Sequence, residues 1–256
     1  MSDKNHSKKV ANQYDNDNYN YLKYWDGRDY EHASEELAIK RLIKGKKFKH
    51  AVDIGGGYGR LCILLKEYSD NVTLAEPSKA QLKIAKDFLR DYPRIDQIIM
   101  QADDLKFKDG TVDLFTMIRV MHHLPDPSKE FAELHRCLSD KGILVLEIAN
   151  NLHFKNRVRY ASKGKKVPLE PVDIRSEQNQ REEEIPFVNH NPKMVIKQLD
   201  TAGFKVVKAL SVSNLRSPSL KKFIPKPFML SVESLMQPTF ARTYFGPSVF
   251  LLLKKK

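Results

Sequence analysis

The feature that most constrains the fold is a run of glycines directly after a short apolar segment. Residues 51–54 are typical of a buried strand that carries Asp53, and Gly55, Gly57 and Gly59 follow at alternate positions. The pattern predicts an amphipathic helix directly afterwards, over residues 60–68. Glycines in such a turn allow positive φ and close approach of a ligand, and the helix N-terminus presents free N–H groups. We therefore expect a ligand site between a strand and a helix of an α/β fold.

The spacing of the glycines separates two classes of cofactor. The dinucleotide fingerprint G-x-G-x-x-G would require its third glycine at position 60, where this chain has Arg60. The chain instead has Asp-x-Gly-x-Gly-x-Gly from Asp53 to Gly59. This resembles the first motif of class I S-adenosylmethionine (SAM) dependent methyltransferases, in which an acid stands two residues before the first glycine. The missing glycine counts against a nicotinamide-dependent oxidoreductase.

An acid follows the next predicted strand. Residues 71–75 are predicted as a strand that leads into Glu76, 21 positions after Gly55, and the segment from Pro77 predicts a helix over 79–89. In doubly wound folds, an acid at the carboxyl end of the second strand can accept hydrogen bonds from both ribose hydroxyls. We expect Glu76 to bind the ribose of the cofactor.

Two further acids follow the third predicted strand, residues 97–101. The resemblance implies that an acid here accepts the adenine amino hydrogen, with Leu105 near the ring. Asp103 is the favoured candidate, and Asp104 is the alternative or else caps the following turn.

The segment after the fourth predicted strand, residues 112–118, carries a second family motif. His123-Leu-Pro-Asp-Pro127 resembles the segment that follows strand 4 in small-molecule methyltransferases of the ubiquinone/menaquinone-biosynthesis type. The resemblance implies that Ile118 and Arg119 line the methionine side of the cofactor. His122 and His123 are the candidate catalytic bases, with His122 slightly favoured, because imidazole titrates near neutral pH. The alternative role for these histidines is to order the loop by hydrogen bonding.

The predicted architecture is a doubly wound, Rossmann-like seven-stranded sheet, mostly parallel, with its last strand antiparallel. A predicted helix over 34–44, with Ser34 as N-cap, precedes the sheet. A turn at 139–142 leads into a strand over 143–148, and the remaining predicted elements are a helix over 193–202, a strand over 204–211, a long connection over 214–246 and a strand over 247–253. We divide the chain into a tail and aromatic flap (1–33), a SAM-binding core (34–150), a basic lid insertion (151–191) and the C-terminal part of the same domain (192–256).

Two segments outside the predicted core are candidates to enclose the acceptor. Residues 1–20 are polar and expected to be largely disordered, and an aromatic cluster over 19–31 then suggests a flap over the site. The long connection over 150–191 must emerge at the carboxyl edge of the sheet, which favours a lid; a solvated insertion is the alternative. The candidate acceptor-enclosing residues are Tyr24, Trp25, Arg28, Tyr30, Arg157 and Arg159.

Composition limits the remaining choices. The net charge of +12 fits a lysine-rich surface, an anionic substrate or nucleic acid. Cys62 and Cys137 have no CxxC spacing and are expected to be reduced thiols of a cytoplasmic protein, with no signal peptide. No apolar stretch approaches the ~18 residues of a membrane span, so no membrane partner is expected.

These patterns together predict a methyltransferase that uses SAM, acts on a small-molecule acceptor and needs no metal; the basic lid is compatible with an anionic acceptor. The complete set of expected cofactor-binding residues is Asp53, Gly55, Gly56, Gly57, Tyr58, Gly59, Glu76, Asp103, Asp104, Leu105, Ile118 and Arg119. An RNA methyltransferase and a catalytically idle SAM-binding protein are the alternatives. RNA is not favoured, because the chain has no appended RNA-binding module and no Asn/Asp-Pro-Pro-Tyr/Phe motif after the fourth strand.

Overall fold

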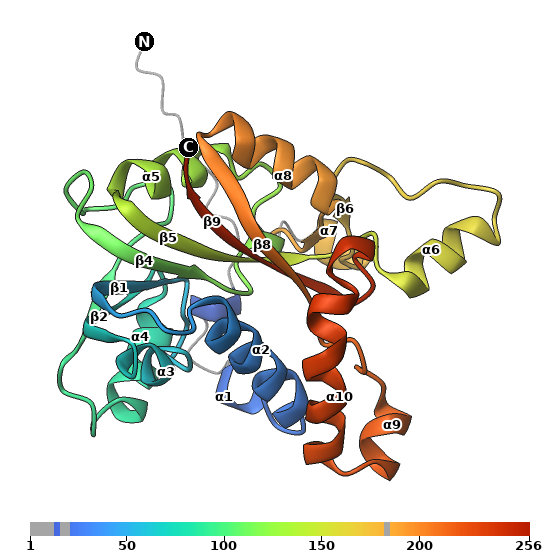
Figure 1. Cartoon of the computed structure of the whole chain (residues 1–256), viewed down its shortest axis with the longest axis horizontal. Coiled ribbons are helices and arrows are strands. Elements are labelled where there is room, and N and C mark those ends of the chain that lie inside the picture. Colours follow the sequence, from blue (N-terminus) through green and yellow to red (C-terminus); the bar gives the residue numbers. More distant parts are fainter. Residues whose placement is uncertain (1–12, 16–20, 182–184) are drawn as a thin grey trace.

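The computed structural model of the protein describes residues 13–15, 21–181 and 185–256. Its centre is a seven-stranded sheet in the order β3-β2-β1-β4-β5-β9-β8 (Figure 1). Strands β1 to β5 pair in parallel, and β9 runs antiparallel to both of its neighbours, which confirms the predicted fold class. The strands are β1 (Phe48–Ile54), β2 (Ser69–Glu76), β3 (Ile95–Ile99), β4 (Val112–Met117), β5 (Leu138–Ala149), β8 (Phe204–Val212) and β9 (Ser248–Lys255).

Apolar side chains on alternate strand positions build two cores, one on each face of the sheet. Ala51 of β1 belongs to the core under α2, α3 and α4, whereas Val52 and Ile54 belong to the core under α5 and α8. Figure 1 shows α5 and α8 on one side of the sheet and α2, α3, α4 and α10 on the other. These helices are α2 (Asp29–Leu42), α3 (Cys62–Lys66), α4 (Lys79–Phe88), α5 (Ser128–Cys137), α8 (Pro192–Thr201) and α10 (Lys226–Thr239).

The strand order places a crevice at the centre of the sheet. The chain moves outward from β1 through β2 to β3, and then returns to the other side of β1 as β4. In open α/β sheets, ligands bind outside the carboxyl ends of the strands at such a switch point. The glycine turn after β1 and the segment after β4 therefore meet at this crevice.

Two predicted boundaries are corrected by the structure. Helix α2 begins at Asp29, not at Ser34, and the Ser34 hydroxyl donates to the Tyr30 carbonyl one turn earlier (2.7 Å). Strand β5 begins at Leu138, so residues 139–142 continue the strand and do not form a turn. The register of β5 against β4 shifts between Val112 and Leu114, an irregularity that apolar periodicity does not show.

The predicted long connection over 214–246 contains two helices, α9 (Pro218–Phe223) and α10, and the 3₁₀ turn η3 (Ala241–Thr243). Because prolines usually interrupt helices, these two helices were not predicted from the sequence. Pro218 and Pro227 lie in the first turns of α9 and α10, where a backbone N–H has no helical partner to lose. Pro238 stands in the last turn of α10.

The insertion after β5 has two unlike arms. Its first arm carries α6 (Phe154–Ala161), which projects from the body in Figure 1. Its second arm returns through β6 (Val172–Asp173), α7 (Glu177–Arg181) and β7 (Val188–Asn189), where His190 Nε2 donates to the Met121 carbonyl (2.9 Å). The second arm therefore packs on the segment that follows β4.

The N-terminal segment is ordered where the structure describes it. Residues 13–15, within the stretch expected to be largely disordered, form the 3₁₀ turn η1 (Gln13–Asp15), and α1 (Tyr21–Tyr24) carries part of the aromatic cluster. Residues 1–12 and 16–20, including Tyr19, and the acidic run 182–184 lie outside the described residues.

Helix α10 is fastened to α2 by a buried carboxylate. Glu233 has no exposed surface, and its oxygens accept from the Tyr30 hydroxyl (2.7 Å) and from the backbone N–H of Ser213 (2.8 Å) and Asn214 (3.0 Å). The Tyr30 oxygen in turn accepts from the Leu215 N–H (3.1 Å). Tyr30, expected to enclose the acceptor, therefore joins two helices.

We predict that Tyr30→Phe lowers the free energy of unfolding by about 1–3 kcal/mol, because it removes the donor to a buried carboxylate and the acceptor for a backbone N–H. Urea denaturation followed by circular dichroism measures this difference. Tyr92→Phe is the matched control, since the Tyr92 side chain is exposed, and it should change stability by less than about 0.5 kcal/mol. Equal stability of the two variants would contradict the assigned role.

Candidate active site

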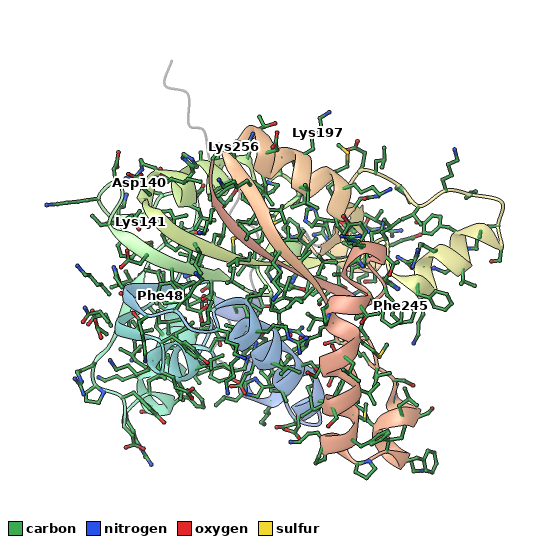
Figure 2. All side chains as sticks on the ribbon, in the orientation of Figure 1. Phe48, Asp140, Lys141, Lys197, Phe245 and Lys256 are labelled. Atoms are coloured by element: carbon green, nitrogen blue, oxygen red, sulfur yellow. The ribbon has the colours of Figure 1, made fainter. Side chains whose placement is uncertain are left out.

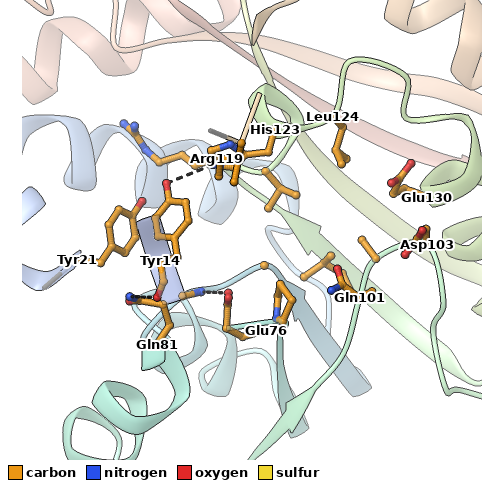
Figure 3. A pocket seen from close by; sticks show the side chains of 17 residues that line it. Tyr14, Tyr21, Glu76, Gln81, Gln101, Asp103, Arg119, His123, Leu124 and Glu130 are labelled. Carbon is orange, nitrogen blue, oxygen red and sulfur yellow. Dashed lines mark hydrogen bonds between the residues drawn. The ribbon is translucent and has the colours of Figure 1, made fainter. Parts of the chain in front are cut away.

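A cavity of about 280 Å³ lies at the carboxyl edge of the sheet, over the crevice between β1 and β4. Residues that follow β1, β2, β3 and β4 line it, together with η1, α1 and the second arm of the insertion. Figure 3 shows Tyr14 and Tyr21 at one end of the cavity and Asp103 and Glu130 at the other. The shape suits an elongated ligand with different chemistry at its two ends.

The glycine turn forms part of the floor. Gly55 and Gly57 line the cavity with φ of +61° and +60°, values that side chains other than glycine rarely adopt. A Cβ on Gly57 would lie 3.2 Å from the Tyr21 ring. Gly56 and Gly59 instead pack against neighbouring side chains (Asp53 and Leu74 for Gly56, Leu89 for Gly59), and Tyr58 is buried against Phe88. The turn therefore presents only two of its five residues to the cavity.

Glu76 is held at the centre of the floor. One carboxylate oxygen accepts from the Gly57 N–H (2.8 Å) and the other from the Ser78 N–H (2.9 Å). The side chain is 6% exposed, and burial raises its pKa to about 7, although the two backbone donors act in the opposite direction. Each oxygen keeps a second lone pair that can accept from a ligand hydroxyl.

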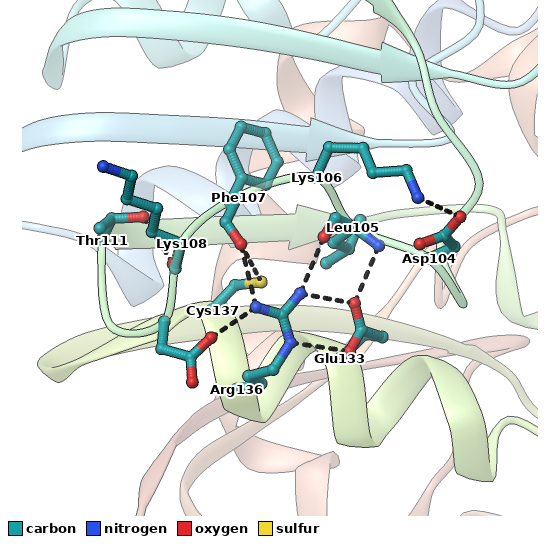
Figure 4. Close-up of polar contacts among 10 residues, drawn as sticks. Asp104, Leu105, Lys106, Phe107, Lys108, Thr111, Glu133, Arg136 and Cys137 are labelled. Carbon is teal, nitrogen blue, oxygen red and sulfur yellow. Dashed lines mark hydrogen bonds and ion pairs between the residues drawn. The ribbon is translucent and has the colours of Figure 1, made fainter.

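The segment after β3 brings Asp103 to the cavity but not Asp104 or Leu105. Asp103 lines the cavity, whereas Asp104 forms an ion pair with Lys106 and Leu105 is buried in the core. Arg136 of α5 holds this segment through the carbonyls of Leu105 (2.8 Å) and Phe107 (3.0 Å), as Figure 4 shows.

Glu130 of α5 stands beside Asp103 and was not predicted. Its side chain is 8% exposed and lines the cavity, and burial raises its pKa. Its Oε2 atom is buried and has no hydrogen-bond partner in the part of the chain that the structure describes. A buried acceptor without a donor is costly, so this atom indicates a ligand donor at this end of the cavity.

Asp53 lies under the glycine turn in a smaller recess of about 20 Å³, with Ile118, Arg119 and Tyr21 among its other walls. Its oxygens accept from the Thr116 hydroxyl (2.6 Å) and the Cys62 thiol (3.8 Å). Burial raises the pKa of Asp53 to about 6. Because Tyr21, Gly55 and Arg119 also line the main cavity, the recess adjoins it.

Arg119 has an unusual backbone and a fully engaged side chain. Its φ is +60°, and its N–H donates to the buried Glu147 (3.1 Å). Its guanidinium binds Glu35 (2.7 Å), and Arg60 binds the other oxygen of the same carboxylate (2.6 Å). These two cations hold the pKa of Glu35 below its usual range, even though its burial alone would raise it.

The two histidines after β4 occupy different environments. His123 lines the cavity, whereas His122, the favoured base, is buried with its ring 4.3 Å from that of Phe187. Burial lowers the pKa of both rings. The His123 Nδ1 lies 2.9 Å from the Pro186 carbonyl, an acceptor only, so Nδ1 carries the hydrogen. His123 Nε2 is then the basic nitrogen, and it accepts from the Tyr14 hydroxyl (3.2 Å), which belongs to another residue of the cavity wall.

Apart from Tyr30, which joins α2 and α10, the expected acceptor-enclosing residues separate into three groups. Tyr24 and Trp25 pack beside the site, where the Tyr24 hydroxyl accepts from Arg119 (3.2 Å) and the Trp25 ring lies 3.8 Å from the Arg60 guanidinium carbon. Arg28 covers the outer face of Tyr24 (4.0 Å). Arg157 and Arg159 lie on α6 and do not line the cavity.

Several cavity residues were outside the sequence prediction. Tyr14 belongs to the segment expected to be disordered, and Ile185 to the insertion, so only tertiary packing reveals them. The Tyr14 carbonyl accepts from the Ser78 hydroxyl (2.7 Å), which pins η1 to the start of α4. The other lining residues that were not predicted are Tyr21, Ile54, Pro77, Gln81, Gln101, Ala102, Val120, Leu124 and Glu130.

Within the ranges that the structure describes, no three His, Cys, Asp or Glu side chains are grouped so that they could hold a metal ion. Nor does any helix of those ranges combine the length and the hydropathy that crossing a bilayer requires.

Comparison with known sequences agrees with this geometry. Residues 52–146 match the model of a methyltransferase domain. Curated relatives include the ubiquinone/menaquinone biosynthesis C-methyltransferases of Psychromonas ingrahamii, 29% identical over 44% of this chain and 46% of that protein, and of Idiomarina loihiensis, 32% identical over 38% and 42%. The chain therefore spans less than half the length of the curated relatives that it matches.

Solved structures share the fold over most of the chain. A methyltransferase from Haloferax volcanii, solved with the methyltransferase activator Trm112, superposes with a TM-score of 0.66 at 18% identity, over 96% of this chain and 99% of that one. A possible histamine N-methyltransferase from Thermotoga maritima gives 0.61 at 20% identity, over 92% and 94%. The 1,6-didemethyltoxoflavin-N1-methyltransferase of Burkholderia thailandensis, solved with S-adenosylhomocysteine, gives 0.57 at 15% identity, over 92% and 85%. Residues 52–146 thus match a methyltransferase domain, as the sequence motifs predicted, and the chain shares its fold with solved methyltransferases.

Proposed function

We propose that this protein binds SAM in the cavity between β1 and β4 and transfers its methyl group to a small-molecule acceptor. The observation that carries the proposal is the placing of Glu76, Asp103 and Glu130 along one cavity above the glycine turn. These three carboxyl side chains can accept hydrogen bonds from a ligand that has hydroxyl groups at its centre and an amino group at one end.

The lining residues fit the adenosine part of such a ligand. Glu76 would accept from the ribose hydroxyls, and Asp103 with the unpartnered Glu130 oxygen would accept from the adenine amino group. Ile54, Pro77 and Leu124 supply apolar walls for the rings. The recess beside Asp53, Tyr21 and Arg119, with room for about one water-sized group, would take the ammonium group of the amino-acid end.

SAM, when bound, supplies a methyl group on a sulfonium, which an acceptor nucleophile takes by in-line displacement while the carbon–sulfur bonding pair leaves with the thioether. The task of the chain is then to align two molecules and exclude water, and alignment alone can contribute about 7–11 kcal/mol. Tyr14 and Tyr21 would cover the site. If the acceptor must lose a proton, His123 Nε2 is the base that the cavity offers, because burial keeps the ring neutral near pH 7.

The acceptor is proposed as a small molecule with a ring or chain that fits beside His123. The curated relatives are named for ubiquinone and menaquinone biosynthesis, and one fold neighbour methylates 1,6-didemethyltoxoflavin. Both names refer to quinone or flavin-like ring compounds and not to RNA, which supports a small-molecule acceptor for this chain.

We predict that Glu76→Ala weakens SAM binding at pH 8 by about 10- to 100-fold, because hydrogen bonds to a charged group contribute about 1.5–3 kcal/mol. Isothermal titration calorimetry gives the dissociation constant. Glu170→Ala removes an exposed carboxylate outside the cavity and should bind SAM like the parent. Unchanged affinity in Glu76→Ala would place the cofactor elsewhere.

Binding of SAM should also tighten with pH. The pKa of Glu76 is about 7, and the ionised form is the stronger acceptor, so the affinity should rise about tenfold between pH 6 and pH 8. Glu76→Gln should flatten this dependence, although Asp53, with a pKa of about 6, leaves a residual slope at the acidic end. A parent protein whose affinity for SAM is the same at pH 6 and pH 8 would contradict the assignment.

The same pKa has the opposite consequence for the stability of the ligand-free protein. Because the folded chain holds the Glu76 proton more tightly than the unfolded chain, its contribution to the free energy of unfolding falls as pH rises from 4.5 to about 7. Denaturation of the parent and of Glu76→Gln across this window measures that contribution.

Turnover tests the proposed reaction itself. With methyl-labelled SAM, the protein should transfer label to the small-molecule fraction of a cell extract and not to the RNA fraction. Label found only in RNA would favour the alternative acceptor. Binding of SAM without any transfer would indicate an idle SAM-binding protein.

A further inference from the structure

A second cavity, of about 580 Å³, lies outside the proposed cofactor site. Four segments line it: the turn between α1 and α2, the start of α6, the connection from β8 to α9, and the residues before β9. Phe245, labelled in Figure 2 near the upper end of α10, lies on its wall. We call this the basic cavity.

The charge of the basic cavity is only partly balanced. Its cations are Arg28, Lys155, Arg216 and Lys221, and its carboxylates are Asp26 and Glu31. Glu31 is 2% exposed and binds Lys221 (3.0 Å), with Arg216 at 3.7 Å. Among the described residues, no carboxylate lies within ion-pair distance of Arg28 or Lys155. Two cations are therefore left for an anionic ligand.

Aromatic side chains form the apolar part of the same cavity. Phe154 is 48% exposed and stacks on Phe245, with ring centroids 5.2 Å apart. Phe240 stacks on the other side of Phe245 (4.8 Å), which holds that ring in place. An exposed phenylalanine beside unbalanced cations suits a ligand with an apolar body and an anionic group.

The position of the basic cavity relates it to the proposed reaction. The cofactor cavity occupies the ends of β1, β2, β3 and β4, whereas the basic cavity lies where β5 and β8 end and β9 begins. Both are at the same edge of the sheet, because β9 runs antiparallel. Tyr24 lies between them: Arg28 of the basic cavity covers its ring, and its hydroxyl accepts from Arg119 of the cofactor cavity.

We propose that the basic cavity binds a carboxylate or phosphate group of the methyl acceptor, whose apolar part lies against Phe154 and Phe245. Arg28 and Lys155 bind the anion, and the Glu31–Lys221 pair fixes the wall behind them. This inference rests on the proposed methyl transfer, since it assigns the acceptor to the half of the sheet edge that the cofactor does not occupy.

The test uses the full chain saturated with SAM and three probes of similar shape: phenyl phosphate, benzoate and benzyl alcohol. Calorimetry should show binding of at least one anion, at least tenfold tighter than that of benzyl alcohol, and the tighter anion identifies the acceptor group. The double variant Arg28→Gln/Lys155→Gln should weaken this binding at least tenfold, whereas Lys163→Gln/Lys166→Gln, which changes two exposed lysines outside the cavity, should not.

Three results would overturn the proposal: no anion binds, benzyl alcohol binds as tightly as the anions, or the two double variants weaken binding equally. The affinity for SAM is measured in the same preparations. If the parent protein binds SAM but no anion, only the role proposed for the basic cavity is contradicted. If the parent protein does not bind SAM, the proposed function is contradicted. Circular dichroism establishes that each variant is folded.

Discussion

The arrangement of the site depends on one buried carboxylate. Glu35 of α2 is 1% exposed and binds Arg60, just after the glycine turn, and Arg119, just after β4. Three segments far apart in sequence are thereby joined at the crevice. Removing one partner of a buried ion pair leaves a charge without compensation, which typically costs 3–5 kcal/mol. The left-handed backbone at Arg119 is held by the same contacts, together with the Glu147 carboxylate that accepts its N–H.

The sheet was predicted well from the sequence, because the local sequence patterns and the rules of sheet topology indicate the same fold. Apolar runs, the glycine turn and the acid after β2 together identify a doubly wound fold, and Glu76 and Asp103 reach the cavity because parallel strands end at one edge. The prediction was weaker where tertiary contacts decide. Arg60 appeared only as a missing glycine, although it binds Glu35 and covers the Trp25 ring. The 214–246 segment was predicted as one long connection, whereas two of its prolines stand in the first turns of helices.

The residues of the candidate site also divide into those that the sequence predicted and those that only tertiary packing reveals. The glycines after β1 and the acids Glu76 and Asp103 were predicted from the sequence, because the ends of β1, β2 and β3 fix their place. Tyr14 and Glu130 were not, since one comes from η1 and the other from the buried face of α5. The choice between His122 and His123 also required packing: neighbouring residues face different ways, and Phe187 from the insertion contacts the ring of His122. Sequence position alone does not separate two adjacent histidines.

The insertion after β5 contributes residues to both cavities. Its second arm contributes Ile185 and the Pro186 carbonyl, which fixes the tautomer of His123, while the start of its first arm contributes Phe154 and Lys155 to the basic cavity. The basic charges of α6 beyond Lys155 do not line either cavity. The proposed anion binding therefore does not require a lid built from the whole basic run. It requires one cation at the start of the insertion, Lys155, and one from the turn before α2, Arg28, beside an aromatic wall at the same sheet edge as the proposed cofactor cavity.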